Sequence, residues 1–122
     1  MGNLLTLLKM MFGAGSTNPG DEVTPPEAIR RLKSNSPPQL VDVRSADEYR
    51  QGKIAGAKLI PLFDLGNRAK EIDKNKPLLL YCQSGNRSGM ALRMLRGQGY
   101  TQAAHLAGGL SAWTRNGFPV DK

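Results

Sequence analysis

The sequence predicts an α/β domain built on a mostly parallel sheet. Short apolar runs alternate along the chain with segments of helical spacing, and the connections between them are short. The clearest run, residues 77–82, is apolar throughout, which is typical of a strand covered on both faces. With 122 residues, of which 39% are hydrophobic, the chain is long enough for one such domain.

The first 20 residues predict a separate segment. Residues 3–12 have the spacing of a short amphipathic helix, and residues 13–20 have the small, turn-forming composition of a flexible linker. We therefore divide the chain into an N-terminal helix with its linker, 1–20, and a domain, 21–122. The apolar face of the helix carries Leu4, Leu5, Leu8, Met11 and Phe12.

That apolar face needs a partner, which we expect to be the domain itself or a second copy of the chain, with a membrane surface as the alternative. The segment is too short to span a bilayer and lacks the basic start of a secretory signal. We therefore expect a cytoplasmic protein, with export or membrane-surface association as the less favoured alternatives.

The first half of the domain reads as helix, strand, helix and strand. Thr24 begins a helix with prolines in its first turn, and this helix should end before residues 35–38. Residues 39–44 are rich in valine and predict a buried strand. Ser45 and Glu48 then have capping-box spacing, with Gly52 closing a short helix, and residues 57–60 form a brief strand candidate.

In the second half, residues 62–72 can hold one or two helical turns before the strand at 77–82. A polar loop with a glycine follows that strand, and residues 89–96 again have helical spacing. Ligand sites in such sheets lie at the carboxyl ends of the strands. Both Asp42 and Cys82 fall at strand ends of this kind.

Cys82 is the only cysteine of the chain and begins the loop between strand and helix. Backbone N–H groups at a helix start have no partner within the helix, so they can point at the sulfur and favour a thiolate. Arg87 adds a positive charge beside this ring. The alternative, an inert buried cysteine, would have apolar neighbours on both sides, whereas here only one side is apolar. The remaining candidate residues of the loop are Gln83, Ser84, Gly85, Asn86 and Ser88.

Composition excludes several other classes of site. One cysteine and one histidine, His105, leave a conventional metal site without enough ligands, so we expect neither a metal nor another cofactor. The net charge of +7 favours anionic partners, but the basic residues are scattered and not interleaved with aromatic ones. We therefore expect a small anionic substrate and no nucleic acid.

Residues 23–120 resemble the rhodanese homology domain. Four features in order carry the resemblance: Asp42–Arg44 with the motif residues that follow up to Pro61, the loop Cys82–Arg87, Arg93 to Tyr100, and residues 106–113 with 117–119. The resemblance implies a rhodanese-like five-stranded, mainly parallel sheet flanked by helices on both faces. It also implies transfer of a sulfane sulfur from thiosulfate or a similar donor to cyanide or a thiol.

In this interpretation Cys82 is the nucleophile that carries the sulfur as a persulfide. The backbone of residues 83–88 would cradle the outer sulfur, and Arg87 would bind the anionic end of the donor. Related phosphatases have one more residue between cysteine and arginine, so the shorter loop here argues against that activity. Two alternatives stay open: a persulfide carrier with a protein sulfur acceptor as partner, and a non-catalytic binding module.

Asp42 and Arg44 are two apart on a strand, so their side chains share a face. We expect a structural salt-bridge cluster there, in which Arg44 can also reach Glu48. If the cluster has a functional role, that role would be to support the Cys82 loop.

Trp113 is expected in the core. His105 is expected to be an ordinary strand residue, because the sequence places no carboxylate near it.

Overall fold

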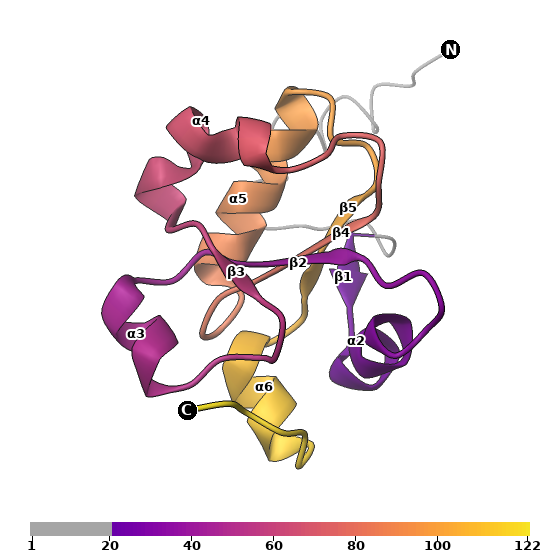
Figure 1. Ribbon diagram of the computed structural model, residues 1–122, viewed down its shortest axis with the longest axis vertical. Coiled ribbons are helices and arrows are strands. Elements are labelled where there is room, and N and C mark those ends of the chain that lie inside the picture. The colour runs from indigo at the N-terminus through magenta and orange to yellow at the C-terminus, as the bar shows by residue number, and fades with distance from the viewer. Residues whose placement is uncertain (1–20) are drawn as a thin grey trace, which may run out of the picture.

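The computed structural model describes residues 21–122, which form a five-stranded sheet with helices on both faces (Figure 1). The strand order is β1-β5-β4-β2-β3, and every pairing between these strands is parallel. The predicted fold class is therefore confirmed. The amphipathic helix expected at residues 3–12 lies outside the described residues. Among the residues described, no helix is long and apolar enough to cross a bilayer.

The predicted elements follow in the expected order along the chain, and the sheet has a short strand at each edge. The strands are β1 Glu22–Val23, β2 Gln39–Asp42, β3 Lys58–Leu59, β4 Leu78–Tyr81 and β5 Ala103–Leu106. The α-helices are α2 Pro25–Leu32, α3 Ala46–Gln51, α4 Leu65–Arg68, α5 Asn86–Gly97 and α6 Gly109–Arg115. Single 3-10 turns, Leu62–Asp64 and Ala69–Glu71, flank α4.

The residues that cap the starts of α2 and α3 form the hydrogen bonds that the sequence predicts. The Thr24 side chain caps α2 by accepting from the Glu27 backbone N–H at 3.4 Å. Ser45 and Glu48 form the reciprocal capping box at the start of α3. The helix after the Cys82 loop begins earlier than predicted, because α5 starts at Asn86 and not near Ser88. Its first turn therefore includes loop residues that the sequence pattern leaves outside.

The core has two parts, one on each face of the sheet. Successive residues of β4 alternate between them, since neighbouring strand side chains point to opposite faces. Leu78 and Leu80 pack with α5, whereas Leu79 and Tyr81 pack with α2 and α6 around Trp113. Trp113 is 2% exposed, as expected for a core residue. This packing on both faces explains why residues 77–82 are continuously apolar.

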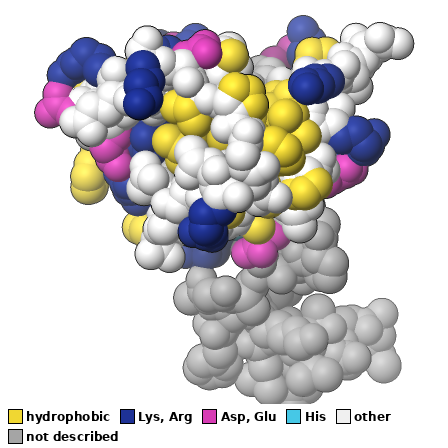
Figure 2. All heavy atoms as spheres, turned by 90° about the horizontal axis from the view of Figure 1, so that it is seen from below, with side chains coloured by type: hydrophobic (Ala, Val, Ile, Leu, Met, Phe, Trp, Pro, Cys, Tyr) yellow, Lys and Arg dark blue, Asp and Glu magenta, His cyan; other side chains and the backbone are white. Residues whose placement is uncertain are grey.

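One surface also carries apolar side chains. Viewed from the side where α2 and α6 lie, hydrophobic side chains gather in the middle of the face, with basic ones around it (Figure 2). An open groove there is lined by Ile29 and Leu32 of α2, Trp113 of α6 and Pro119. This groove lies on the opposite face of the sheet from α5.

Candidate active site

The loop between β4 and α5 closes around the sulfur of Cys82. The backbone N–H of Gly85 donates to Sγ at 3.1 Å, and that of Ser88 donates at 3.3 Å. The Ser88 hydroxyl lies 3.5 Å from the same sulfur. Cys82 has no exposed surface, and its thiol is the only one in the chain. The loop thus provides convergent donors around one buried sulfur atom.

Gly85 allows the loop to turn tightly around the sulfur. Its φ of +106° lies in the left-handed region, which is costly for residues with a side chain, and it immediately precedes α5. Because α5 begins at Asn86, the N–H group of Ser88 belongs to the first turn and has no partner within the helix. The helix start therefore supplies a donor to the sulfur.

These donors shift the ionisation of Cys82. Burial raises the pKa of the thiol, but hydrogen bonds from the Ser88 hydroxyl and from the backbone of Ser88, Gly85 and Ser84 outweigh it. The resulting pKa lies below the ordinary value of a cysteine, because each of these bonds favours the anion. The geometry thus favours a thiolate that can act as a nucleophile.

Arg87, whose positive charge we expect beside the ring, is paired with a carboxylate in the structure. Its two terminal nitrogens bind both oxygens of Glu48, at 2.7 and 2.9 Å. This bond lowers the pKa of Glu48 to about 2. The guanidinium is thus already paired with a carboxylate. The sequence pattern suggested that Glu48 pairs with Arg44, but in the structure Glu48 binds Arg87.

The Asp42–Arg44 pair is buried and reaches the loop from the neighbouring strand. Asp42 is 0% and Arg44 2% exposed. The Arg44 guanidinium donates from Nη2 to Asp42 Oδ2 at 2.7 Å and to the Gly52 carbonyl at 2.6 Å. From Nη1 it also donates to Gln83 Oε1 at 3.2 Å. The salt bridge expected between Asp42 and Arg44 therefore connects directly to the residue after Cys82.

Helix α6 holds the other side of the loop. The backbone N–H groups of Leu110 and Ser111 donate to the carbonyls of Cys82 and Gln83 at 2.9 and 3.0 Å. The Gln83 side chain donates in turn to the Ser111 hydroxyl at 3.0 Å. A side chain at Gly109 would place its Cβ 2.5 Å from the Cys82 carbonyl oxygen, so only glycine allows this approach.

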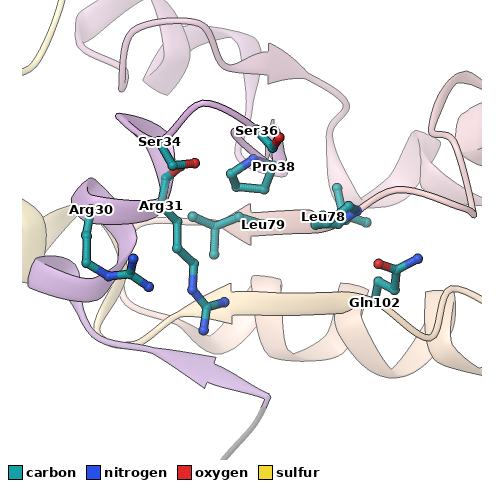
Figure 3. A pocket seen from close by; sticks show the side chains of 9 residues that line it. Arg30, Arg31, Ser34, Ser36, Pro38, Leu78, Leu79 and Gln102 are labelled. Atoms are coloured by element: carbon teal, nitrogen blue, oxygen red, sulfur yellow. The ribbon is translucent and has the colours of Figure 1, made fainter.

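Two hollows lie at opposite ends of the sheet. One borders the Cys82 loop, with Arg44, Glu48 and Gln83 in its wall. The other, shown in Figure 3, is lined by Leu78 at the beginning of β4, by Gln102 just before β5, and by Arg31 of α2. Since Cys82 follows the far end of β4, the second hollow is separate from the loop.

The structure brings one further residue to the loop. His105 lies in β5, as expected, but its Nδ1 is 2.9 Å from the Ser88 hydroxyl oxygen. The expectation that no carboxylate is near it was wrong, because β1 pairs Glu22 directly opposite His105. The Glu22 carboxylate lies 3.7 Å from Nε2. No local motif signals this arrangement, which depends on the register of an edge strand.

Comparison with known proteins agrees with this geometry. Residues 24–116 match the Rhodanese-like domain family. The chain belongs to this family. It is 36% identical to a sulfurtransferase of Allochromatium vinosum over 82% of its own length and 94% of that protein. It is 31% identical to a thiosulfate sulfurtransferase of Pseudomonas aeruginosa, over 79% of this chain and 86% of the relative.

The fold of this rhodanese-like chain is also seen in solved structures. A rhodanese-related protein of Thermoplasma volcanium superposes with a TM-score of 0.75 at 27% identity, covering 82% of this chain and 96% of that one. Other curated relatives are longer, and the chain spans about half of their length. Family membership and the named relatives together support sulfur-transfer chemistry in general.

Proposed function

We propose that the protein is a sulfurtransferase in which Cys82 carries a sulfane sulfur as a persulfide. The observation that carries the proposal is the buried Cys82 sulfur surrounded by donors from Gly85 and Ser88. Donors that favour a thiolate also favour the persulfide anion formed on it, because both place negative charge on sulfur. The relatives named as sulfurtransferases support the same reaction class.

With thiosulfate as donor, the Cys82 thiolate attacks the outer sulfur. The new bond from Sγ forms as the sulfur–sulfur bond of thiosulfate breaks, and sulfite leaves with the bonding electron pair. Cyanide or a thiolate acceptor then attacks the outer sulfur of the persulfide and releases the Cys82 thiolate. Because the Gly85 and Ser88 donors favour the ionised form of Cys82, we assign no separate general base to the first step.

The remaining residues of the site have supporting roles in this proposal. In this proposal the backbone from Gln83 to Ser88 surrounds the transferred sulfur. Arg44, held by its ion pair with Asp42, fixes the Gln83 side chain through a hydrogen bond. The Arg87 side chain is partly exposed, so it could meet the anionic end of the donor. Asn86 begins α5 and Ser84 adds a backbone donor toward the sulfur.

A second candidate is a persulfide carrier that receives its sulfur from a protein. One observation favours it: Glu48 occupies both terminal nitrogens of Arg87, which reduces the positive charge available to a dianion such as thiosulfate. A protein persulfide carries less charge and would depend on this arginine less. The two candidates share Cys82 and differ in the donor.

Steady-state transfer of sulfur to cyanide, followed as thiocyanate, separates these candidates. We expect turnover with thiosulfate by the wild-type protein and none by Cys82→Ser, which keeps a similar shape without a thiol. Turnover with a small organic persulfide but not with thiosulfate would favour the carrier. Thiocyanate formation by Cys82→Ser at the wild-type rate would contradict both.

A further inference from the structure

Cys82, Ser88 and His105 form a continuous chain from the end of β4, through the first turn of α5, to β5. The Ser88 hydroxyl oxygen lies 3.5 Å from Cys82 Sγ and 2.9 Å from His105 Nδ1. All three residues are buried, with exposures of 0%, 0% and 4%. The mechanism above uses the first two of these residues and leaves His105 without a role.

The Ser88 hydroxyl has one proton and three neighbours that could accept it. These are the Cys82 sulfur, the Gly85 carbonyl at 3.3 Å and His105 Nδ1, provided that Nδ1 carries no hydrogen. The Gly85 carbonyl already accepts from the Gly89 backbone N–H at 3.0 Å. Which way the hydroxyl points therefore depends on where the histidine holds its hydrogen.

The surroundings of the other ring nitrogen, Nε2, determine which nitrogen of the neutral His105 ring carries the hydrogen. Nε2 is buried and has no hydrogen-bond partner among residues 21–122, since the Glu22 carboxylate is 3.7 Å away. A buried N–H without an acceptor is more costly than an acceptor with a free lone pair, so the neutral ring holds its hydrogen on Nδ1. Nδ1 then donates to Ser88, and the Ser88 hydroxyl must donate elsewhere.

We propose that His105 is a positioning residue for Cys82, which acts by donating from Nδ1 to Ser88 and so directs the Ser88 hydroxyl to the sulfur. The Cys82 thiolate is the strongest acceptor within reach, because a hydrogen bond to a charged group exceeds one to a carbonyl, and after sulfur transfer the charge lies on the outer sulfur of the persulfide. The persulfide part of this role rests on the proposed function. The thiolate part does not, because it can be measured with no sulfur donor present.

Several charges surround the imidazole. Burial lowers the pKa of His105, Glu22 and Asp21 partly offset this, and Arg93 of α5 lowers it further. Asp21 is itself ion-paired with Arg96. The ring therefore stays neutral at neutral pH. In acid the second proton enters at Nε2, facing Glu22, and the Nδ1 hydrogen remains in place.

The single thiol makes the first test unambiguous. The rate of alkylation of Cys82 by iodoacetamide is measured against pH, which gives the midpoint of thiolate formation. We expect Ser88→Ala to move this midpoint up by about one pH unit, since it removes the hydroxyl bond to the anion. His105→Leu should move it in the same direction by a smaller amount, since the hydroxyl is then no longer directed away from the Gly85 carbonyl. His105→Asn, whose amide N–H is as many bonds from Cα as Nδ1, should restore most of the wild-type profile.

Two controls distinguish a positioning role of His105 from a general structural effect of its substitution. Glu22→Gln changes the neighbour of Nε2 without touching the Nδ1 bond, so the midpoint should stay at the wild-type value. The double variant Ser88→Ala with His105→Leu should move the midpoint no further than Ser88→Ala alone, because His105 acts through Ser88. Additive shifts, or a wild-type midpoint in a folded His105→Leu, would overturn the proposal.

A second measurement needs no substitution at His105. The chain has one histidine, so nitrogen-15 spectra of labelled protein report its ring alone. We expect the hydrogen on Nδ1 at neutral pH, and a change in the Nδ1 signal when Cys82 is alkylated. A hydrogen on Nε2 would overturn the proposal even if every variant failed to fold. Neither measurement involves sulfur transfer, so failure of the proposed function would be seen separately.

Discussion

At the scale of single residues, the site depends on charges that are buried and paired. Arg44 and Asp42 form a bond of this kind, with almost no exposed surface on either side chain. Arg44 also holds the Gly52 carbonyl and the Gln83 side chain, so one guanidinium joins β2, the end of α3 and the active-site loop. Removing it would leave the Asp42 carboxylate buried without its partner.

We therefore predict that Arg44→Met lowers the free energy of unfolding by about 3 kcal/mol, the usual effect of breaking a buried ion pair. Urea denaturation followed by circular dichroism measures this. The matched control is Arg50→Met, which removes an exposed arginine paired with Asp47 and should cost less than about 1 kcal/mol. Equal losses in the two variants would contradict the role given to Arg44.

Glu48 sets the charge that Arg87 offers to a donor. We predict that Glu48→Gln lowers the KM for thiosulfate several-fold, because it removes a negative charge from the site and frees the guanidinium. The comparison is Asp47→Asn, which removes an exposed carboxylate of the same helix that does not touch Arg87. An unchanged or raised KM in Glu48→Gln would show that thiosulfate does not meet Arg87.

The same ion pair has a defined dependence on pH. The hydrogen bond from Arg87 is the largest cause that lowers the pKa of Glu48 to about 2. A carboxyl group whose pKa is lowered by folding stabilises the fold above its unfolded value, near 4.5, and loses this contribution as pH falls toward 2. Glu48→Gln should therefore flatten the stability profile between these two pH values, while leaving its slope above pH 5 unchanged.

At the scale of elements, α6 reaches the loop through Gly109. Its φ is +62°, and an added Cβ would lie 2.5 Å from atoms of Cys82 and Gln83. We predict that Gly109→Ala displaces the loop and slows alkylation of Cys82 at pH 7 by about tenfold or more. Gly117→Ala is the control, because Gly117 has a similar φ of +77° but no atom within 4 Å of the added Cβ.

If strain at positive φ alone mattered, the two alanine variants would behave alike. A loss of stability without a change in alkylation is expected for Gly117→Ala, since only its backbone is affected. Equal alkylation rates in both variants would contradict the contact between α6 and the loop.

Most elements were predictable because their signals are local. The caps at Thr24 and Ser45 and the apolar run of β4 each lie within a few residues, and each forms as the pattern indicates. Other elements were not predicted individually. Strand β1 has only two residues, which is too short for an alternating pattern, and α5 begins on loop residues of polar character.

The site was predictable as far as it follows one stretch of chain. The backbone donors around Cys82 come from the loop itself, so the spacing from Cys82 to Ser88 was enough to expect them. The partners of Arg87 and Ser88 were not predictable in this way. Glu48 is 39 residues from Arg87, and His105 is 17 residues from Ser88, so both contacts depend on how the strands are ordered.

At the scale of the whole molecule, the parallel sheet brings these separate residues together. Asp42 pairs with Tyr81 across β2 and β4, so both strands end at the same edge, where the Cys82 loop begins. The two parts of the core hold α5 and α6 on opposite faces, and each helix contributes its first turn to the loop (Figure 1). The domain thus positions one sulfur atom from both sides.

The most direct test of this account is the intact mass of the protein after incubation with thiosulfate, and again after cyanide is added. We predict that the wild-type chain gains the mass of one sulfur atom, that cyanide removes it, and that Cys82→Ala never gains it. A wild-type chain that stays unmodified under conditions where alkylation shows Cys82 to be a reactive thiolate would contradict transfer from thiosulfate through a Cys82 persulfide.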